Sequence, residues 1–257
     1  MWTSVEKFVY PIVIIVLNKC YSRNMKRVVI INGVGVGIDS EHFLVKVFVQ
    51  KEYEVLIINL LDDTVVINNL DIKFVPDVIV GFSLGGMVAI KLIYQYPSAK
   101  LVLLATGSRI FPSRHIFRIA YWISQSNFGL KMLMNLVRFP RNWLLRLNRL
   151  FQASDVDLNT KFGADMSALK NIQYFKKISF VKWREVISFI NNFDGHDYCL
   201  KIINPTLIIS GNKDVLMPPK LGRELNLLIS NSKFVVSDGL HFDVLSGVGL
   251  KALEEFI

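Results

Sequence analysis

Three side chains that lie far apart in the sequence have the types and the order that nucleophilic catalysis by an alcohol requires: Ser83, Asp214 and His241. A serine hydroxyl is a weak nucleophile near neutral pH, and it needs an imidazole to accept its proton. The imidazole in turn needs a carboxylate that fixes its tautomer and stabilises its positive charge. Such a set performs acyl transfer, so we predict that Ser83 is a nucleophile, His241 its general base and Asp214 the orienting acid.

The segment around Ser83 predicts a strand, a sharp turn and a helix. The apolar run Val78–Val80 precedes the turn Gly81-Phe82-Ser83-Leu84-Gly85, and apolar residues at helical spacing follow in Met87–Ile93. Glycines are expected on both sides of the serine because a β-carbon would clash in so tight a bend. The hydroxyl of Ser83 should therefore project alone above the edge of a sheet.

The predicted acid and base each follow an apolar run that indicates a strand. Residues 206–209 form one such run and lead into the loop that carries Asp214, and a second run ends shortly before His241. Two other aspartates, Asp238 and Asp243, lie too near His241 in the sequence to orient it easily. The remaining histidines do not stand in a loop of this kind: His42, His115 and His196.

Acyl transfer by a serine also needs two backbone amides that stabilise the negative oxygen of the tetrahedral intermediate. One is expected to be the amide of Leu84, directly after the nucleophile and at the positive end of the following helix. The other should come from a glycine-rich loop after an earlier strand, and residues 28–31 followed by Asn32-Gly33-Val34 supply such a loop. Val34 is the expected donor.

These motifs, in this order, resemble those of the α/β-hydrolase superfamily from about Lys26 to the C-terminus. The resemblance implies an α/β fold with a mainly parallel sheet, helices on both faces and an inserted helical cap, and it implies no cofactor and no metal. The family usually has His-Gly before the amide donor, whereas this chain has Asn32-Gly33. That departure leaves Gly35 and Val36 as alternative donors.

Gly33, Gly35 and Gly37 after a strand also suggest a dinucleotide-binding fold. The spacing is one residue short of that fingerprint, and the position expected to bind a ribose holds Asn59 rather than an acid. The sequence contains no motif for a nucleoside triphosphate or for zinc. We therefore prefer the hydrolase interpretation.

Length and composition indicate one large domain with an insertion. The chain has 257 residues, of which 52% are hydrophobic. We expect a hydrolase core over residues 25–106 and 204–257, and a helical cap over residues 107–203 that selects the substrate. Residues 1–24 hold an apolar run that is too short to span a membrane, so we interpret it as an edge strand or packing segment, or as a membrane-surface anchor. The chain has only two cysteines, which leave one disulfide open but give no disulfide framework and suit a reducing compartment, so we expect a cytoplasmic protein.

The first half of the predicted cap has a one-sided charge. No Asp or Glu occurs between Val78 and Ser154, and the chain as a whole has a formal net charge of +9. The basic residues fit a solvated face, attraction to anionic lipid, or the docking of an acidic protein that delivers the acyl substrate. No nucleic-acid motif accompanies them, so we expect no nucleic-acid partner.

The arginine-rich cap and the turn Gly81–Gly86 resemble the pimeloyl-carrier-protein methyl ester esterases of biotin synthesis. The resemblance implies an acyl ester substrate on an acidic acyl carrier protein, held by cap arginines. Two alternatives remain open, a membrane-associated lipase or acyl thioesterase and a non-catalytic binding module on the same fold. The arginines that the resemblance implies as carrier contacts are Arg118, Arg138, Arg141 and Arg149.

Overall fold

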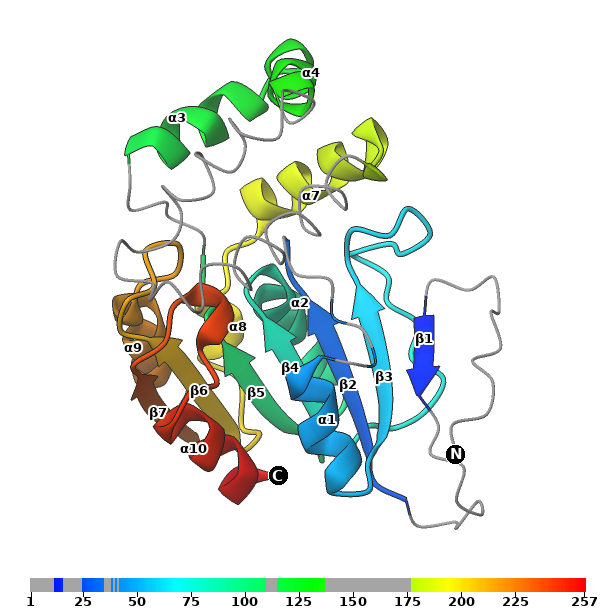
Figure 1. Ribbon diagram of the computed structural model, residues 1–257, viewed down its shortest axis with the longest axis vertical. Helices are drawn as coiled ribbons and strands as arrows, with labels where there is room; N and C mark the ends of the chain where they lie inside the picture. Colours follow the sequence, from blue (N-terminus) through cyan, green and yellow to red (C-terminus); the bar gives the residue numbers. More distant parts are fainter. Residues whose placement is uncertain are drawn as a thin grey trace, which may run out of the picture.

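A computed structural model describes residues 12–15, 25–34, 38, 40, 42–109, 115–136 and 177–257 of the chain. In this part of the chain, one sheet has the strand order β1-β3-β2-β4-β5-β6-β7 (Figure 1). All neighbouring strands pair in parallel except β1, which pairs antiparallel with β3. The strands are β1 (Ile12–Ile15), β2 (Arg27–Asn32), β3 (Glu54–Asn59), β4 (Val78–Phe82), β5 (Lys100–Leu104), β6 (Thr206–Gly211) and β7 (Ser232–Ser237).

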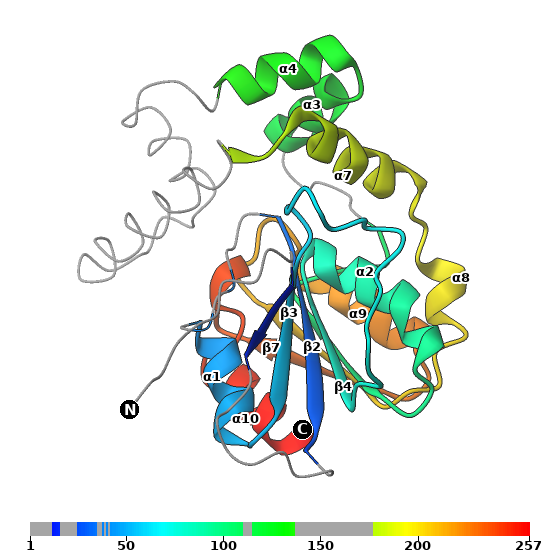
Figure 2. The ribbon, with the colours of Figure 1, turned by 90° about the vertical axis from the view of Figure 1, so that its right-hand side faces the viewer.

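Helices cover both faces of this sheet. In Figure 2 the sheet is seen edge-on, with α1 and α10 on one side and α2, α8 and α9 on the other. The helices α3, α4 and α7 stand beyond the end of the sheet (Figures 1 and 2). The described helices are α1 (Phe43–Gln50), α2 (Leu84–Leu92), η1 (Ile93–Gln95), α3 (His115–Ser124), α4 (Asn127–Leu136), α7 (Phe180–Asn192), α8 (His196–Cys199), α9 (Pro219–Leu228), η2 (His241–Asp243) and α10 (Val248–Phe256).

The central strands are buried on both faces, which explains why they are continuous apolar runs in the sequence. Along β2, Val29 and Ile31 belong to the core cluster on the α2 side of the sheet. Val28 and Ile30 belong to the cluster on the α1 and α10 side. Because side chains alternate along a strand, a run of four apolar residues feeds both clusters. The predicted α/β-hydrolase fold class is confirmed.

The N-terminal apolar run contributes an edge strand. Residues 12–15 form β1, and Ile12 pairs with Ile58 of β3 while Ile15 pairs with Val55. The other residues of the segment 1–24 lie outside the described part of the chain. No helix among the described residues is both long and apolar enough to cross a lipid bilayer.

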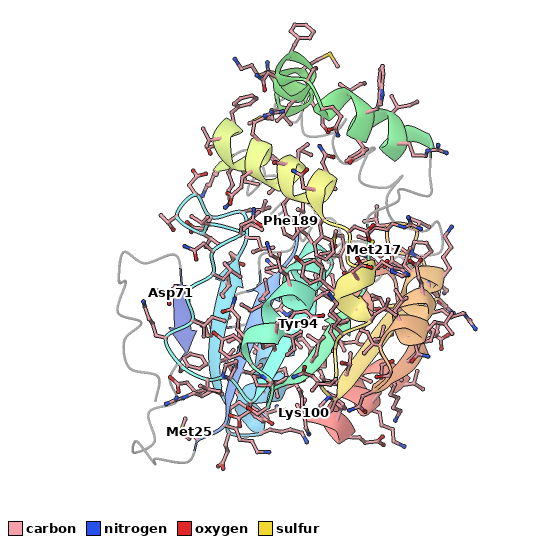
Figure 3. The ribbon with its side chains drawn as sticks, turned by 180° about the vertical axis from the view of Figure 1, so that it is seen from behind. Met25, Asp71, Tyr94, Lys100, Phe189 and Met217 are labelled. Carbon is pink, nitrogen blue, oxygen red and sulfur yellow. The ribbon has the colours of Figure 1, made fainter. Side chains whose placement is uncertain are left out.

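The helices α3, α4 and α7 lie in the segment for which a cap is predicted, and α7 is tied to the core at several points. Phe189 of α7 is buried in the core cluster on the α2 side, and Figure 3 shows it where α7 faces the sheet. Lys182 of α7 is buried, donates to the carbonyl of Val65 and forms an ion pair with Glu185 at 2.7 Å. Glu185 also accepts from the amide of Ile67. These contacts hold α7 against the connection between β3 and β4.

Cys199, at the end of α8, should be chemically inert in the folded protein. Burial raises the pKa of its thiol to about 12, from a usual 9.0. Because only the thiolate reacts with alkylating agents, a raised pKa means less reactive sulfur at any pH below about 12. At pH 8 we expect iodoacetamide to modify Cys199 at least about 100-fold more slowly in the native protein than in urea, as measured by mass spectrometry of its peptide. Equal rates in both states would contradict the buried position.

Candidate active site

Ser83 stands at the turn between β4 and α2, in a strained backbone conformation. Its φ is 54° and its ψ is −120°, a region that side-chain-bearing residues rarely occupy. The turn is so tight that a β-carbon on Gly81 would lie 2.5 Å from the Cα of Gly86, and one on Gly85 would overlap the carbonyl oxygen of Ile31. The glycines predicted from the sequence are therefore required by close backbone contacts.

Backbone and side-chain hydrogen bonds hold this strained turn in place. The amide of Ser83 donates to the carbonyl of Leu104 at 2.9 Å. The carbonyl of Ser83 accepts from the amide of Gly86 at 2.9 Å and from the hydroxyl of Thr106 at 2.7 Å. Thr106 is buried just after β5 and was not singled out in the sequence. A lone threonine after a strand carries no signal that its hydroxyl supports a turn 23 residues earlier.

Thr106→Val should weaken this support without changing the shape of the side chain. We expect the free energy of unfolding to fall by about 1 kcal/mol, because one buried hydrogen bond is lost. Turnover of any Ser83-dependent reaction should fall by less than about ten-fold, because Gly86 still binds the same carbonyl. Urea denaturation and initial rates measure the two effects. Thr106→Ser, which keeps the hydroxyl, is the matched control, and an equal loss of stability in it would show that the methyl group matters instead.

Asp214 lies in the loop after β6, and its two carboxylate oxygens have separate partners. Oδ1 accepts from the amides of Leu216 and Met217, each at 2.8 Å. Oδ2 lies 2.7 Å from Nδ1 of His241. The carboxyl group is buried, so its charge is poorly screened by water and acts strongly on the imidazole. The backbone amides fix the rotation of the carboxylate and leave one oxygen for the histidine.

His241 begins the short helix η2 after β7 and joins the acid to the serine. Its Nε2 lies 3.1 Å from Oγ of Ser83. Since a carboxylate can only accept, Nδ1 carries the proton toward Asp214, and Nε2 is left to accept from the serine hydroxyl. The buried imidazole ring packs against Phe82 and Phe242, with ring centres 5.2 and 5.1 Å away, and the two phenyl rings are 6.3 Å from each other. The three predicted side chains thus form one hydrogen-bonded series.

The loop after β2 lies directly against the serine. A β-carbon on Gly33 would come within 2.6 Å of the Phe82 carbonyl oxygen, 2.8 Å of the Ser83 β-carbon and 3.1 Å of the Leu84 nitrogen. Leu84 is the first residue of α2, where amides have no partner within the helix. Val34 follows Gly33 at this contact. The amides of Leu84 and Val34 are therefore both candidates for stabilising the oxyanion. The alternative donors Gly35 and Val36 lie outside the described residues.

Two other histidines and one other aspartate have different partners. His42 caps α1, accepting from the amide of Leu44 at 3.2 Å. His196 lies on the surface of α8, 3.5 Å from Asp197. Asp238 accepts from Asn212 at 3.0 Å. The side chain of His115 is not among those described, nor are Arg138, Arg141 and Arg149, whereas Arg118 is exposed on α3. Within the described ranges, no three His, Cys, Asp or Glu side chains gather as a metal site would require.

A cavity of about 310 Å³ borders the aromatic rings around His241. It lies between the start of α1 and the residues after His241, and it is mainly apolar. Among the described residues that line it, Asp243 carries the one carboxyl group, and partial desolvation raises the pKa of that group. The sequence offered no signal for the cavity because its walls come from four separate segments. It is lined by Ile38, His42, Phe43, Leu44, Phe82, Leu104, Phe242, Asp243, Val244 and Leu245.

A mostly parallel sheet, a serine on a strained strand-to-helix turn and a helical segment inserted between β5 and β6 are typical of the α/β hydrolases. The family model described as the alpha/beta hydrolase fold matches residues 66–248. This match spans most of the sequence, so the chain belongs to that family.

Solved structures of low sequence identity share this fold. A bromoperoxidase from Bacillus anthracis is 18% identical with a TM-score of 0.61, and 90% of each chain is covered. An enol-lactonase from Burkholderia xenovorans LB400 is 19% identical with a TM-score of 0.60, over 90% of this chain and 89% of the other. An esterase from Exiguobacterium antarcticum is 15% identical with a TM-score of 0.59, over the same shares. No curated protein matches the sequence.

Proposed function

We propose that the protein is a serine hydrolase that cleaves carboxylic esters through an acyl-enzyme formed on Ser83. The observation that carries this proposal is the hydrogen-bonded series from the Asp214 carboxylate through His241 to the Ser83 hydroxyl, at 2.7 and 3.1 Å. Burial of all three side chains supports it, because a water-poor site strengthens each electrostatic interaction.

In the first half of the proposed reaction, Ser83 Oγ attacks the ester carbonyl carbon while His241 Nε2 takes the hydroxyl proton. The carbonyl π electrons move to the oxygen, which becomes an oxyanion in a tetrahedral intermediate. When the intermediate collapses, the bond to the alcohol breaks and His241 gives its proton to the leaving oxygen. In the second half, water repeats the attack on the acyl-enzyme and releases the carboxylic acid and Ser83.

We propose that the amides of Leu84 and Val34 stabilise the oxyanion. Leu84 is at the N-terminus of α2, where the helix dipole favours negative charge. Val34 belongs to the loop that contacts the turn through Gly33. One such donor typically contributes about 3 kcal/mol to the stabilisation of the transition state.

The cavity beside His241 supports an apolar, uncharged substrate group of moderate size. Its walls include the rings of Phe43, Phe82 and Phe242. A cavity of roughly 150 Å³ accommodates benzene in another protein, so about 310 Å³ suits a ring or a medium-length acyl chain. The carboxyl group of Asp243 in the wall would disfavour an anionic group there.

A panel of p-nitrophenyl esters tests this proposal. We expect hydrolysis of acetate, butyrate and hexanoate esters, with kcat/KM highest for a medium-length chain, and slow hydrolysis of palmitate. A fluorophosphonate probe should label Ser83 and abolish turnover. Folded protein that neither turns over any ester nor reacts with the probe would instead be the non-catalytic binding module. Parallel reactions with an acyl thioester and with a methyl ester of a carrier-bound dicarboxylate separate the finer substrate alternatives.

A further inference from the structure

The outer surface of the cap exposes large apolar side chains. Trp122 of α3 is 79% exposed and Phe128 of α4 is 82% exposed. Ile119 of α3 and Met132 of α4 are 58% and 41% exposed. An exposed leucine or valine is ordinary by itself, but a tryptophan and a phenylalanine with such exposure on consecutive helices need an explanation.

On each of these two helices, the exposed apolar side chains lie on one face. Phe128, Lys131 and Met132 have the i, i+3, i+4 spacing of one helical face, while Leu130, on another face of α4, is buried. A β-carbon on Gly129 would overlap the carbonyl oxygen of Ile123, so the two helices pack closely. The apolar surface is therefore the outer face of an ordered helical pair and not the result of loose packing.

Contacts with α7 hold this helical pair in place. The hydroxyl of Tyr121 on α3 donates to the side chain of Asn191 on α7. Arg184 of α7 donates to the carbonyl of Gln125 at 3.3 Å. The ammonium of Lys131 lies 5.3 Å from the centre of the Phe180 ring. Because α7 is tied to the core, the outer face of α3 and α4 has a defined orientation relative to the sheet.

The charge around this patch is positive. Neither α3 nor α4 contains an acidic residue, and none occurs in the sequence from Val78 to Ser154. Arg118 of α3 and Lys131 of α4 are both exposed and flank the apolar side chains. We call the set Arg118, Ile119, Trp122, Phe128, Lys131 and Met132 the cap face.

We propose that the cap face is a docking surface for an anionic lipid bilayer, with Trp122 and Phe128 inserted among the headgroups. Amphipathic helices bind membranes by burying apolar side chains at the headgroup boundary while basic residues attract anionic lipid. Tryptophan suits that boundary because its ring is apolar and its N–H is polar. Of the described helices, α3 and α4 stand farthest from the sheet (Figures 1 and 2).

Lipid fits this surface better than an acidic protein does. The cap face combines four exposed apolar side chains with only two cations, so ion pairs with an acidic partner would by themselves leave Trp122 and Phe128 in water. A bilayer removes that area from water and pairs with Arg118 and Lys131 at the same time. The proposal does not depend on catalysis, so it can be tested in protein whose Ser83 is replaced.

Co-sedimentation with vesicles tests this inference. We expect the full-length protein to bind vesicles of phosphatidylcholine with phosphatidylglycerol, to bind pure phosphatidylcholine weakly, and to be released by high salt. Trp122→Ser combined with Phe128→Ser should reduce binding to the anionic vesicles by at least about ten-fold. Arg118→Glu combined with Lys131→Glu should remove the preference for anionic lipid.

A matched control separates this surface from any exposed apolar side chain. Leu227 of α9 is 80% exposed and lies outside the cap, so Leu227→Ser should leave vesicle binding unchanged. Unchanged melting temperatures would show that the variants fold. Absence of binding to anionic vesicles, or equal binding by the Trp122→Ser, Phe128→Ser protein, would overturn the proposal. Binding of a purified acidic acyl carrier protein through the same residues, without vesicle binding, would assign the cap face to a protein partner instead.

Discussion

Alanine in place of Ser83 is expected to lower kcat for ester hydrolysis by about a million-fold, as loss of the nucleophile does in other serine hydrolases. The change removes only Oγ, which lies 3.1 Å from His241 and forms the acyl bond in the proposed mechanism. The free energy of unfolding should change by less than about 1 kcal/mol, because the backbone contacts of the turn stay in place. Initial rates with p-nitrophenyl butyrate and urea denaturation measure these quantities.

Two further measurements test whether the loss of activity comes from the Ser83 hydroxyl itself. Fluorophosphonate labelling, followed by mass spectrometry, should disappear with Ser83→Ala. Ser83→Gly should be equally inactive but more stable than Ser83→Ala, since glycine adopts a φ of 54° without strain. A Ser83→Ala protein with more than about one-hundredth of the original kcat would mean that another residue is the nucleophile.

Asparagine in place of Asp214 should lower kcat by about ten-thousand-fold while leaving the fold intact. The side-chain oxygen of the asparagine would still accept from the backbone amides of Leu216 and Met217. Its NH₂ group would then take the place of Oδ2 and face Nδ1 of His241. Two donors cannot pair, so the imidazole proton would move to Nε2, which then cannot accept the proton of Ser83. The loss should therefore appear in kcat far more than in KM.

Asp238→Asn is a suitable control for this substitution. Asp238 lies nearer to His241 in the sequence, but its carboxylate accepts from Asn212 at 3.0 Å and it is not the acid that contacts the imidazole. Its replacement should change kcat by less than about two-fold. If instead Asp214→Asn retained more than about a tenth of the original kcat, the orienting role of Asp214 would be wrong.

The positions of the strands were available from the sequence because they are local signals. A parallel strand covered on both faces is a short apolar run between polar turns, and the run predicted over residues 206–209 lies within β6. The turn around Ser83 was equally clear, since only glycine fits where backbones touch. The order of nucleophile, acid and base along the chain also indicates the α/β-hydrolase fold.

Tertiary structure alone decided which distant groups meet. His241 contacts Ser83 across 158 residues, and which of several aspartates orients it depends on how the loops after β6 and β7 pack. Thr106, the cavity beside Phe242 and the antiparallel pairing of β1 left no recognisable pattern in the sequence.

The cap face shows most clearly the difference between what the sequence indicates and what the tertiary structure decides. In the sequence, Trp122 and Phe128 each belong to a segment whose apolar residues recur at helical spacing. Such spacing is equally typical of a helix face that is buried in a core. In the structure they are 79% and 82% exposed, and α7 contacts α3 and α4 through Tyr121 and Lys131 instead. Apolar periodicity along a chain identifies which side chains share a face, but only the neighbours that fold against that face determine whether water, protein or lipid covers it.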